Sequence, residues 1–401
     1  MKMKKNIASL ILSTLLLLPF LTGCHDLVFS NILEDVVPEE ATVNGSINSI
    51  TRYTVSSQEY LVTYSTNGII YKSKDDDFHG AWHKYTHLPF ELHYYDYYET
   101  THFGQQIIKT AADADNLYIV TVEYANHPSL GTNYPKHFYI WSAKITSWDS
   151  EPSWTDLNAD DSIAWAYREG NYYYTDFNVF CTNAPRKEHR KAFARNKNNQ
   201  LYELKGTTVS TSISATHPNW DIPGDGKMDS VVYFGNYYLI DGMASTTNET
   251  YSANPTHVYF AQDKSSRVYF NVNSGSISES NRSSLDAGEA VSCLAITKNA
   301  LLIGRANAES SSASYGGIVK ANATDWVPET TLSSFTTNAA AQMPSSYLIN
   351  TLLAIDSDKN ETETAIYGSI IFRTIGTSSS VNYDNVGLWS YYPSRGNWNR
   401  E

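Results

Sequence analysis

The sequence feature that most constrains this fold is a recurring unit of roughly sixty residues. Each unit has an apolar strand, a short turn, a second aromatic strand and a polar loop, and it often ends in a strand pair that carries tryptophan. The units start near residues 46, 108, 163, 228, 290 and 346. A unit of this length suits four short antiparallel strands, which bury their faces only against neighbouring units. The spacing therefore predicts a series of similar small sheets.

The predicted strands fall into two repeating sets. The inner strands are expected at 60–64, 117–121, 172–174, 231–240, 300–303 and 348–355, and the outer ones at 68–73, 138–142, 201–205, 267–270, 317–320 and 387–391. A composition with 30 tyrosines and 9 tryptophans favours strands. We expect an all-β fold, a β-propeller over 46–401 with six four-stranded blades; seven blades, a pair of sandwiches and a β-helix are the alternatives.

One local motif supports a propeller. The segment from Ser73 through Asp75 and Gly80 to Trp82 resembles the Asp-box of sialidase-like propellers, with two residues inserted relative to the family's spacing. In that family the Ser and Asp side chains bond the backbone of a turn, and the aromatic residue fills the blade. The resemblance implies that Asp75 forms a turn and has no catalytic role.

The first 24 residues predict how the chain is exported. Lys2, Lys4 and Lys5 precede an apolar run over 7–20, which is shorter than a bilayer-spanning helix and leads to Leu-Thr-Gly-Cys24. This order resembles bacterial lipoprotein signals, in which the cysteine is lipidated and the chain is cleaved before it. The resemblance implies a signal peptide over 1–23, a lipidated Cys24 with an acidic tether over 24–45, and an exported domain over 46–401.

Charge and the anchor together limit the partners. The net charge of −13 argues against nucleic acid, because the basic residues form one local cluster, between Arg186 and Lys197. We expect the protein in the cell envelope, held on the inner or outer membrane by lipid on Cys24 and facing the periplasm or the surface, with a protein or carbohydrate partner.

Two cysteines remain beside Cys24, and no cofactor or metal is expected. Cys181 and Cys293 either form one disulfide or are small buried residues. His79, His83 and His87 recur every four residues but flank a strand, where that spacing does not align them for a metal. The acidic loops 221–229 and 356–363 offer oxygen ligands for calcium, but neither has the full ligand pattern of an EF-hand loop. We therefore expect both loops to be solvated turns.

A sialidase-like glycosidase would need three arginines for a substrate carboxylate, together with a Tyr and Glu pair. The N-terminal Arg-Ile-Pro motif of that family is missing. Four arginines lie near the ends of expected inner strands and could converge: Arg52, Arg168, Arg305 and Arg373. Glu123 and Asp176 are candidate acid and base residues, although the sequence does not fix their separation.

Aromatic residues crowd the segment 93–103. Tyr94, Tyr95, Tyr97 and Tyr98 would stack on a sugar or dock a protein if they are exposed, or form a packed edge strand. We therefore expect a non-enzymatic binding or scaffold module for a protein or glycan partner. The alternatives are a glycoside hydrolase of sialidase-like type and a structural subunit of an envelope complex.

Overall fold

The computed structural model describes a large part of the chain beyond residue 42. The described residues are 43, 45, 47–66, 68–75, 82–92, 104–127, 131–161, 163, 179–181, 183, 187, 190–195, 201–210, 260–261, 267–269, 282–284, 289–296, 300–307, 317–324, 327–335, 348–356, 364–371, 386–392 and 397–401. Residues from Val43 onward form one compact unit. Among the described residues, no helix is both long and apolar enough to cross a membrane.

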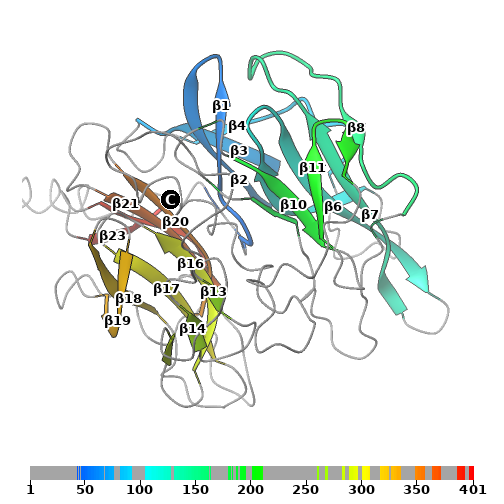
Figure 1. The fold of residues 1–401 in the computed structure, drawn as a ribbon. Coiled ribbons are helices and arrows are strands. Elements are labelled where there is room, and N and C mark those ends of the chain that lie inside the picture. Colours follow the sequence, from blue (N-terminus) through cyan, green and yellow to red (C-terminus); the bar gives the residue numbers. More distant parts are fainter. Residues whose placement is uncertain are drawn as a thin grey trace, which may run out of the picture. The chain divides into compact units, whose positions relative to one another are not determined.

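The described elements are all β-strands, and they form six sheets in chain order (Figure 1). Sheet A contains β1 (Thr51–Val55), β2 (Gln58–Ser65), β3 (Gly68–Ser73) and β4 (His83–Lys84). Sheet B contains β5 (Gln105–Ala112), β6 (Leu117–His127), β7 (Gly131–Ala143) and β8 (Thr155–Asp156). Sheet C contains β9 (Val179–Cys181), β10 (Ala192–Arg195), β11 (Leu201–Lys205) and β12 (Thr208–Val209).

The second half of the chain repeats the same pattern. Sheet D has three described strands, β13 (Phe260–Ala261), β14 (Arg267–Tyr269) and β15 (Arg282–Ser284). Sheet E contains β16 (Glu289–Ile296), β17 (Ala300–Asn307), β18 (Ile318–Thr324) and β19 (Val327–Ser334). Sheet F contains β20 (Leu348–Asp356), β21 (Thr364–Ile371), β22 (Gly387–Tyr392) and β23 (Asn397–Arg400). In every sheet, consecutive strands pair antiparallel, so the all-β prediction is confirmed, and the four-stranded unit is confirmed in the five sheets other than sheet D.

The strand positions correct one part of the prediction. The segments 60–64, 117–121 and 300–303, expected as inner strands, are the second strands of their sheets. The first strands are β1, β5 and β16. The predicted strand ranges lacked β1, β5 and β16, because strands were assigned from the most strongly buried runs, such as Leu61 to Ser65 of β2.

The hydrophobic cores lie between neighbouring sheets. One core joins residues of sheet A to Ile107 and Ile119 of sheet B and to Leu353 and Tyr367 of sheet F. A second joins sheets B and C, and a third joins sheets E and F. Sheet A therefore packs against both the sheet that follows it and the last sheet of the chain.

A buried ion pair joins sheets A and F. Lys72 Nζ lies 2.8 Å from Glu401 Oε2, and both side chains are 0 % exposed. Trp82 Nε1 donates to the same oxygen at 2.7 Å. The ammonium of Lys72 also lies over the rings of Trp82 and Tyr367. These contacts satisfy a charge that would otherwise be costly to bury.

Candidate functional site

Several predicted site residues lie outside the described residues: Cys24, Tyr94, Tyr95, Tyr97, Tyr98, Arg168, Arg373, Asp176, His79 and the loop 221–229. Cys181 and Cys293 are described, and both are free and buried. Cys181 Sγ lies 3.1 Å from Thr51 Oγ1, and Cys293 Sγ lies 3.9 Å from the Ile349 carbonyl oxygen. This corrects the disulfide alternative, since each thiol packs within its own sheet interface.

The predicted turn at Ser73 is present. The Asp75 amide donates to Ser73 Oγ at 3.3 Å, and Gln58 donates to both side chains. His83 and His87 lie beside tyrosine rings of sheet A and its following loop. Within the described ranges, no group of three His, Cys, Asp or Glu residues is arranged to hold a metal ion.

Sheet B brings Glu123 together with a tyrosine that the sequence did not single out. Tyr139 Oη on β7 donates to Glu123 Oε2 on β6 at 2.7 Å, and Lys136 Nζ lies 2.8 Å from Glu123 Oε1. Burial, followed by the hydrogen bond to Glu123, raises the pKa of the Tyr139 phenol. The hydrogen bonds from Lys136 and Tyr139 hold the pKa of Glu123 below its usual range. The pair therefore combines an ionised carboxylate with a neutral phenol.

The antiparallel register of β6 and β7 explains why Glu123 meets Tyr139. Glu123 lies opposite His137, and Thr121 lies opposite Tyr139, so the four side chains share one face of sheet B. Glu123, His137 and Tyr139 are half-buried. His137 packs edge-on against the Tyr139 ring, and its Nδ1 lies 2.9 Å from Asp161 Oδ1. A carboxylate, a phenol and an imidazole thus meet on a partly accessible surface.

Aromatic rings extend this face toward sheet A. Tyr139 stacks on Trp141 with centroids 5.5 Å apart and planes at 7°, and Phe90 lies at 6.1 Å from Trp141. Gln105 Oε1 accepts from Trp141 Nε1 at 2.9 Å, which fixes the indole. Half-buried aromatic faces beside polar groups suit the stacking of sugar rings.

The lowered pKa of Glu123 leads to a pH prediction. We expect Lys136→Met to raise the pKa of Glu123, because the carboxylate loses its neighbouring ammonium. Titration of the Glu123 carboxyl group by NMR measures this. Lys144→Met, which removes the exposed lysine that follows β7, serves as the control and should leave the pKa of Glu123 in place; an unshifted Glu123 pKa in Lys136→Met would contradict the role of the Lys136 ammonium.

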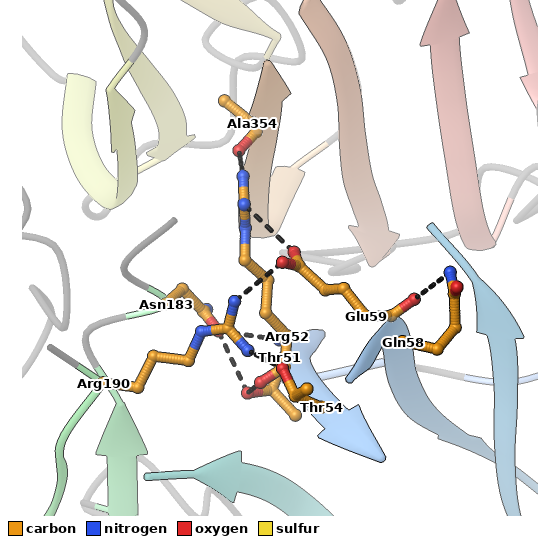
Figure 2. Close-up of polar contacts among 8 residues, drawn as sticks. All are labelled: Thr51, Arg52, Thr54, Gln58, Glu59, Asn183, Arg190 and Ala354. Atoms are coloured by element: carbon orange, nitrogen blue, oxygen red, sulfur yellow. Dashed lines mark hydrogen bonds and ion pairs between the residues drawn. The ribbon is translucent and has the colours of Figure 1, made fainter. Parts of the chain in front are cut away.

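A second polar cluster joins sheets A, C and F (Figure 2). Arg52 Nη1 lies 3.1 Å from Glu59 Oε1, and Arg190 Nη2 lies 2.8 Å from Glu59 Oε2. Arg52 Nη2 also donates to the Ala354 carbonyl of β20 at 2.8 Å. Arg52 and Arg190 are both 3 % exposed. Two buried guanidinium groups therefore share one carboxylate.

Thr51 and Asn183 complete this cluster. Asn183 Oδ1 accepts from the Arg52 amide and from Thr51 Oγ1, each at 3.0 Å. Arg52 was one of the arginines expected to converge, and it shares Glu59 with Arg190 from the basic cluster. Arg305, another of the four, lies on β17. Desolvation lowers the pKa of Arg190, and the charge of Arg52 acts in the same direction.

Lys109 is a half-buried cation on β5. Burial lowers its pKa to about 8, and Cys181 interacts electrostatically with both Lys109 and Arg190. The folded protein holds the Lys109 proton less tightly than the unfolded chain, whose lysine has a pKa of 10.5. The unfolded state therefore binds more protons between these values, and stability rises with pH across that window.

We expect the titration of Lys109 to increase the free energy of unfolding by about 3 kcal/mol between pH 8 and pH 10.5. Urea unfolding at pH 8 and at pH 10.5 measures it, with Lys109→Met as the comparison that removes the titrating group. Cys181, Arg52, Arg190 and Glu59 stay in both proteins, so their titration cancels. Equal pH dependence in the two proteins would contradict a desolvated Lys109.

Comparison with known proteins gives similarity to solved structures only. No protein-family model and no curated protein matches the sequence. An arginine mutant of AofleA from Arthrobotrys oligospora is 10 % identical with a TM-score of 0.39, covering 90 % of this chain and 86 % of that one. An exo-1,5-alpha-L-arabinanase from a bovine ruminal metagenomic library is 10 % identical with a TM-score of 0.31, covering 88 % and 94 %. The GH43 protein BlXynB from Bacillus licheniformis is 9 % identical with a TM-score of 0.31, covering 83 % and 50 %.

These matches correct the expected function. The sequence analysis favoured a non-enzymatic binding or scaffold module, whereas several matched structures are family 43 glycoside hydrolases. At these TM-scores the matches assign no activity to this chain.

Proposed function

We propose that this chain is a glycoside hydrolase of sialidase-like type, in which Tyr139 is the nucleophile and Glu123 its general base. The observation that carries the proposal is the 2.7 Å hydrogen bond from Tyr139 Oη to a carboxylate oxygen of Glu123 on a half-exposed face. A nucleophile and a base within hydrogen-bond distance are what covalent catalysis requires. A tyrosine nucleophile suits a sugar that bears a carboxylate at its anomeric carbon, because a carboxylate nucleophile would be repelled.

Each group then has a role in a two-step reaction. Glu123 takes the proton of Tyr139 Oη as that oxygen forms a bond to the anomeric carbon, and the bond to the leaving oxygen breaks. His137, held by Asp161, supplies the proton of the leaving alcohol. Water then attacks the anomeric carbon, gives a proton to His137 and releases Tyr139, which recovers its proton from Glu123. Trp141 offers a ring face on which the sugar packs.

The fold that carries this site is proposed to be a β-propeller with six blades, one for each sheet. Support comes from the repeated antiparallel unit and from the cores that join sheet A to both sheets B and F. The backbone bond from the Val43 amide to the Glu401 carbonyl at 3.0 Å adds a direct link between the two ends of the repeat region. Radial repetition protects the outer sheet edges.

A lipid on Cys24 is proposed to hold the enzyme in the cell envelope, on the inner or outer membrane, where envelope or extracellular glycans are the substrates. We expect Cys24→Ser to move the protein from the membrane fraction to the soluble fraction, because the thiol that takes the diacylglycerol is gone. Immunoblots of separated fractions measure this. Cys181→Ser, a control at a buried thiol, should remain with the membrane; membrane retention of Cys24→Ser would exclude the anchor.

Hydrolysis of fluorogenic glycosides tests the activity. The panel contains a sialoside, an arabinofuranoside and a xyloside, assayed with the purified exported domain after circular dichroism has shown that it is folded. The proposal predicts turnover of the sialoside. A folded protein that hydrolyses none of the three would exclude the glycosidase.

A further inference from the structure

The side-chain amide of Gln105 lies on the same face of sheet B as Tyr139, and its oxygen is held in place. Gln105 Oε1 accepts hydrogen bonds from Trp141 Nε1, at 2.9 Å, and from Thr121 Oγ1. An indole N–H only donates, so the amide atom that contacts Trp141 must be the oxygen. Among the described residues, neither N–H of the side-chain amide has a hydrogen-bond partner. Gln105 therefore presents a free donor group whose orientation is fixed.

The backbone of Gln105 is fixed as well. Its amide donates to the carbonyl of Glu91, in the segment after β4, at 2.8 Å. Thr121, whose hydroxyl holds the Gln105 side chain, is 0 % exposed. Gln105 itself is half-buried. A donor that is already in position when a ligand arrives loses little conformational freedom on binding it.

This donor group lies where the face of sheet B becomes accessible. Ile107 and Ile119, further along the same face, belong to the core shared with sheet A. Gln105 lies opposite Glu123, which lies opposite His137, so these three residues form one row across β5, β6 and β7. The side chains of Glu123 and His137 are 30 % and 18 % exposed. The free amide donors are therefore next to the proposed general base, at the partly open end of the face.

We propose that Gln105 determines substrate specificity by donating a hydrogen bond from its side-chain amide to an uncharged oxygen of the bound sugar, a hydroxyl or an acyl carbonyl. The nature of the ligand rests on the proposed glycoside hydrolase function. Gln105 acts as a donor only, because its oxygen already accepts two hydrogen bonds, so it selects an acceptor oxygen. The carboxylate of Glu123 lies on the neighbouring strand, and it repels an anionic group at this position while it tolerates a neutral oxygen.

Gln105→Glu tests the donor with little change in shape. A glutamate keeps an oxygen that accepts from Trp141 and Thr121, but its carboxylate has no N–H to donate. We expect KM for the fluorogenic sialoside to rise about tenfold, with a smaller change in kcat, because a hydrogen bond to the bound substrate is lost. Gln105→Met also removes the donor and adds no charge, so it should show the same rise in KM. Gln106→Glu is the matched control, because Gln106 is exposed and lies on the opposite face of β5, and its KM should stay at the wild-type value.

NMR separates this contact from the hydrolytic reaction. The side-chain amide signals of Gln105, assigned by their loss in Gln105→Met, are followed in Tyr139→Phe during titration with methyl α-sialoside. We expect these signals to shift with the sialoside and to stay in place with sodium acetate at the same concentration. A shift in a protein whose wild type hydrolyses no glycoside would support the sugar contact and contradict only the proposed hydrolysis. Signals that the sialoside does not move would overturn the role of Gln105 even if the wild type hydrolyses sialosides, and an equal shift with acetate would overturn the uncharged acceptor.

Discussion

Glu401→Gln is expected to lower the free energy of unfolding by about 3–5 kcal/mol. The substitution keeps the shape of the side chain and an oxygen that accepts from Trp82 Nε1, but it removes the charge that pairs with Lys72. Both partners are 0 % exposed, so water does not replace the lost carboxylate. The ammonium of Lys72 then loses this counter charge while it stays buried between sheets A and F. Equilibrium urea unfolding at neutral pH measures the loss.

Two further variants separate this ion pair from general damage. Lys72→Met combined with Glu401→Gln removes both charges, and it should be less destabilised than Glu401→Gln alone. Asp115→Asn removes an exposed acid whose partners Lys144 and Lys187 are also exposed, and it should change stability by no more than about 1 kcal/mol. A decrease in the free energy of unfolding below about 1 kcal/mol in Glu401→Gln would show that the ion pair does not stabilise the packing of sheets A and F.

Tyr139→Phe is expected to reduce kcat by about 10³-fold or more, since the phenylalanine ring keeps the packing on Trp141 and His137 but has no oxygen to attack the sugar. Glu123→Gln should reduce kcat by about 10²–10⁴-fold, because the amide does not take the phenol proton. Steady-state hydrolysis of the fluorogenic sialoside measures both. Tyr60→Phe, a half-buried tyrosine of sheet A, is the matched control and should keep wild-type activity. Wild-type turnover by Tyr139→Phe would remove Tyr139 from the reaction.

Strand positions were predictable where local signals bounded them. β3 begins at Gly68 and β11 ends before Gly206, and both strands match the predicted ranges because glycine turns mark their limits. The hairpin that joins β1 to β2 gave no such signal. Its turn residues Ser56 and Ser57 adopt positive φ values of 48° and 71°, a conformation that glycine or asparagine normally marks. The first strand of sheet A was therefore missed.

The candidate site was predictable only in part, because its residues depend on register and on long-range contacts. Glu123 was recognised as an acid at the end of an apolar run. Its contact with Tyr139 depends on a register that shifts beyond Glu123, and spacing along the sequence does not give such shifts. Arg190 reaches Glu59 across 131 residues, a contact that the local sequence does not encode.

Trapping of the covalent intermediate tests the central claim most directly. A sialic acid analogue fluorinated at carbons 2 and 3 has a good leaving group and a slowed second step, so the glycosyl-enzyme persists long enough for mass spectrometry. The account predicts one adduct on the intact protein, located on the peptide that contains Tyr139 and absent from Tyr139→Phe. An adduct on any other residue, or hydrolysis of sialosides without an adduct on Tyr139, would contradict it.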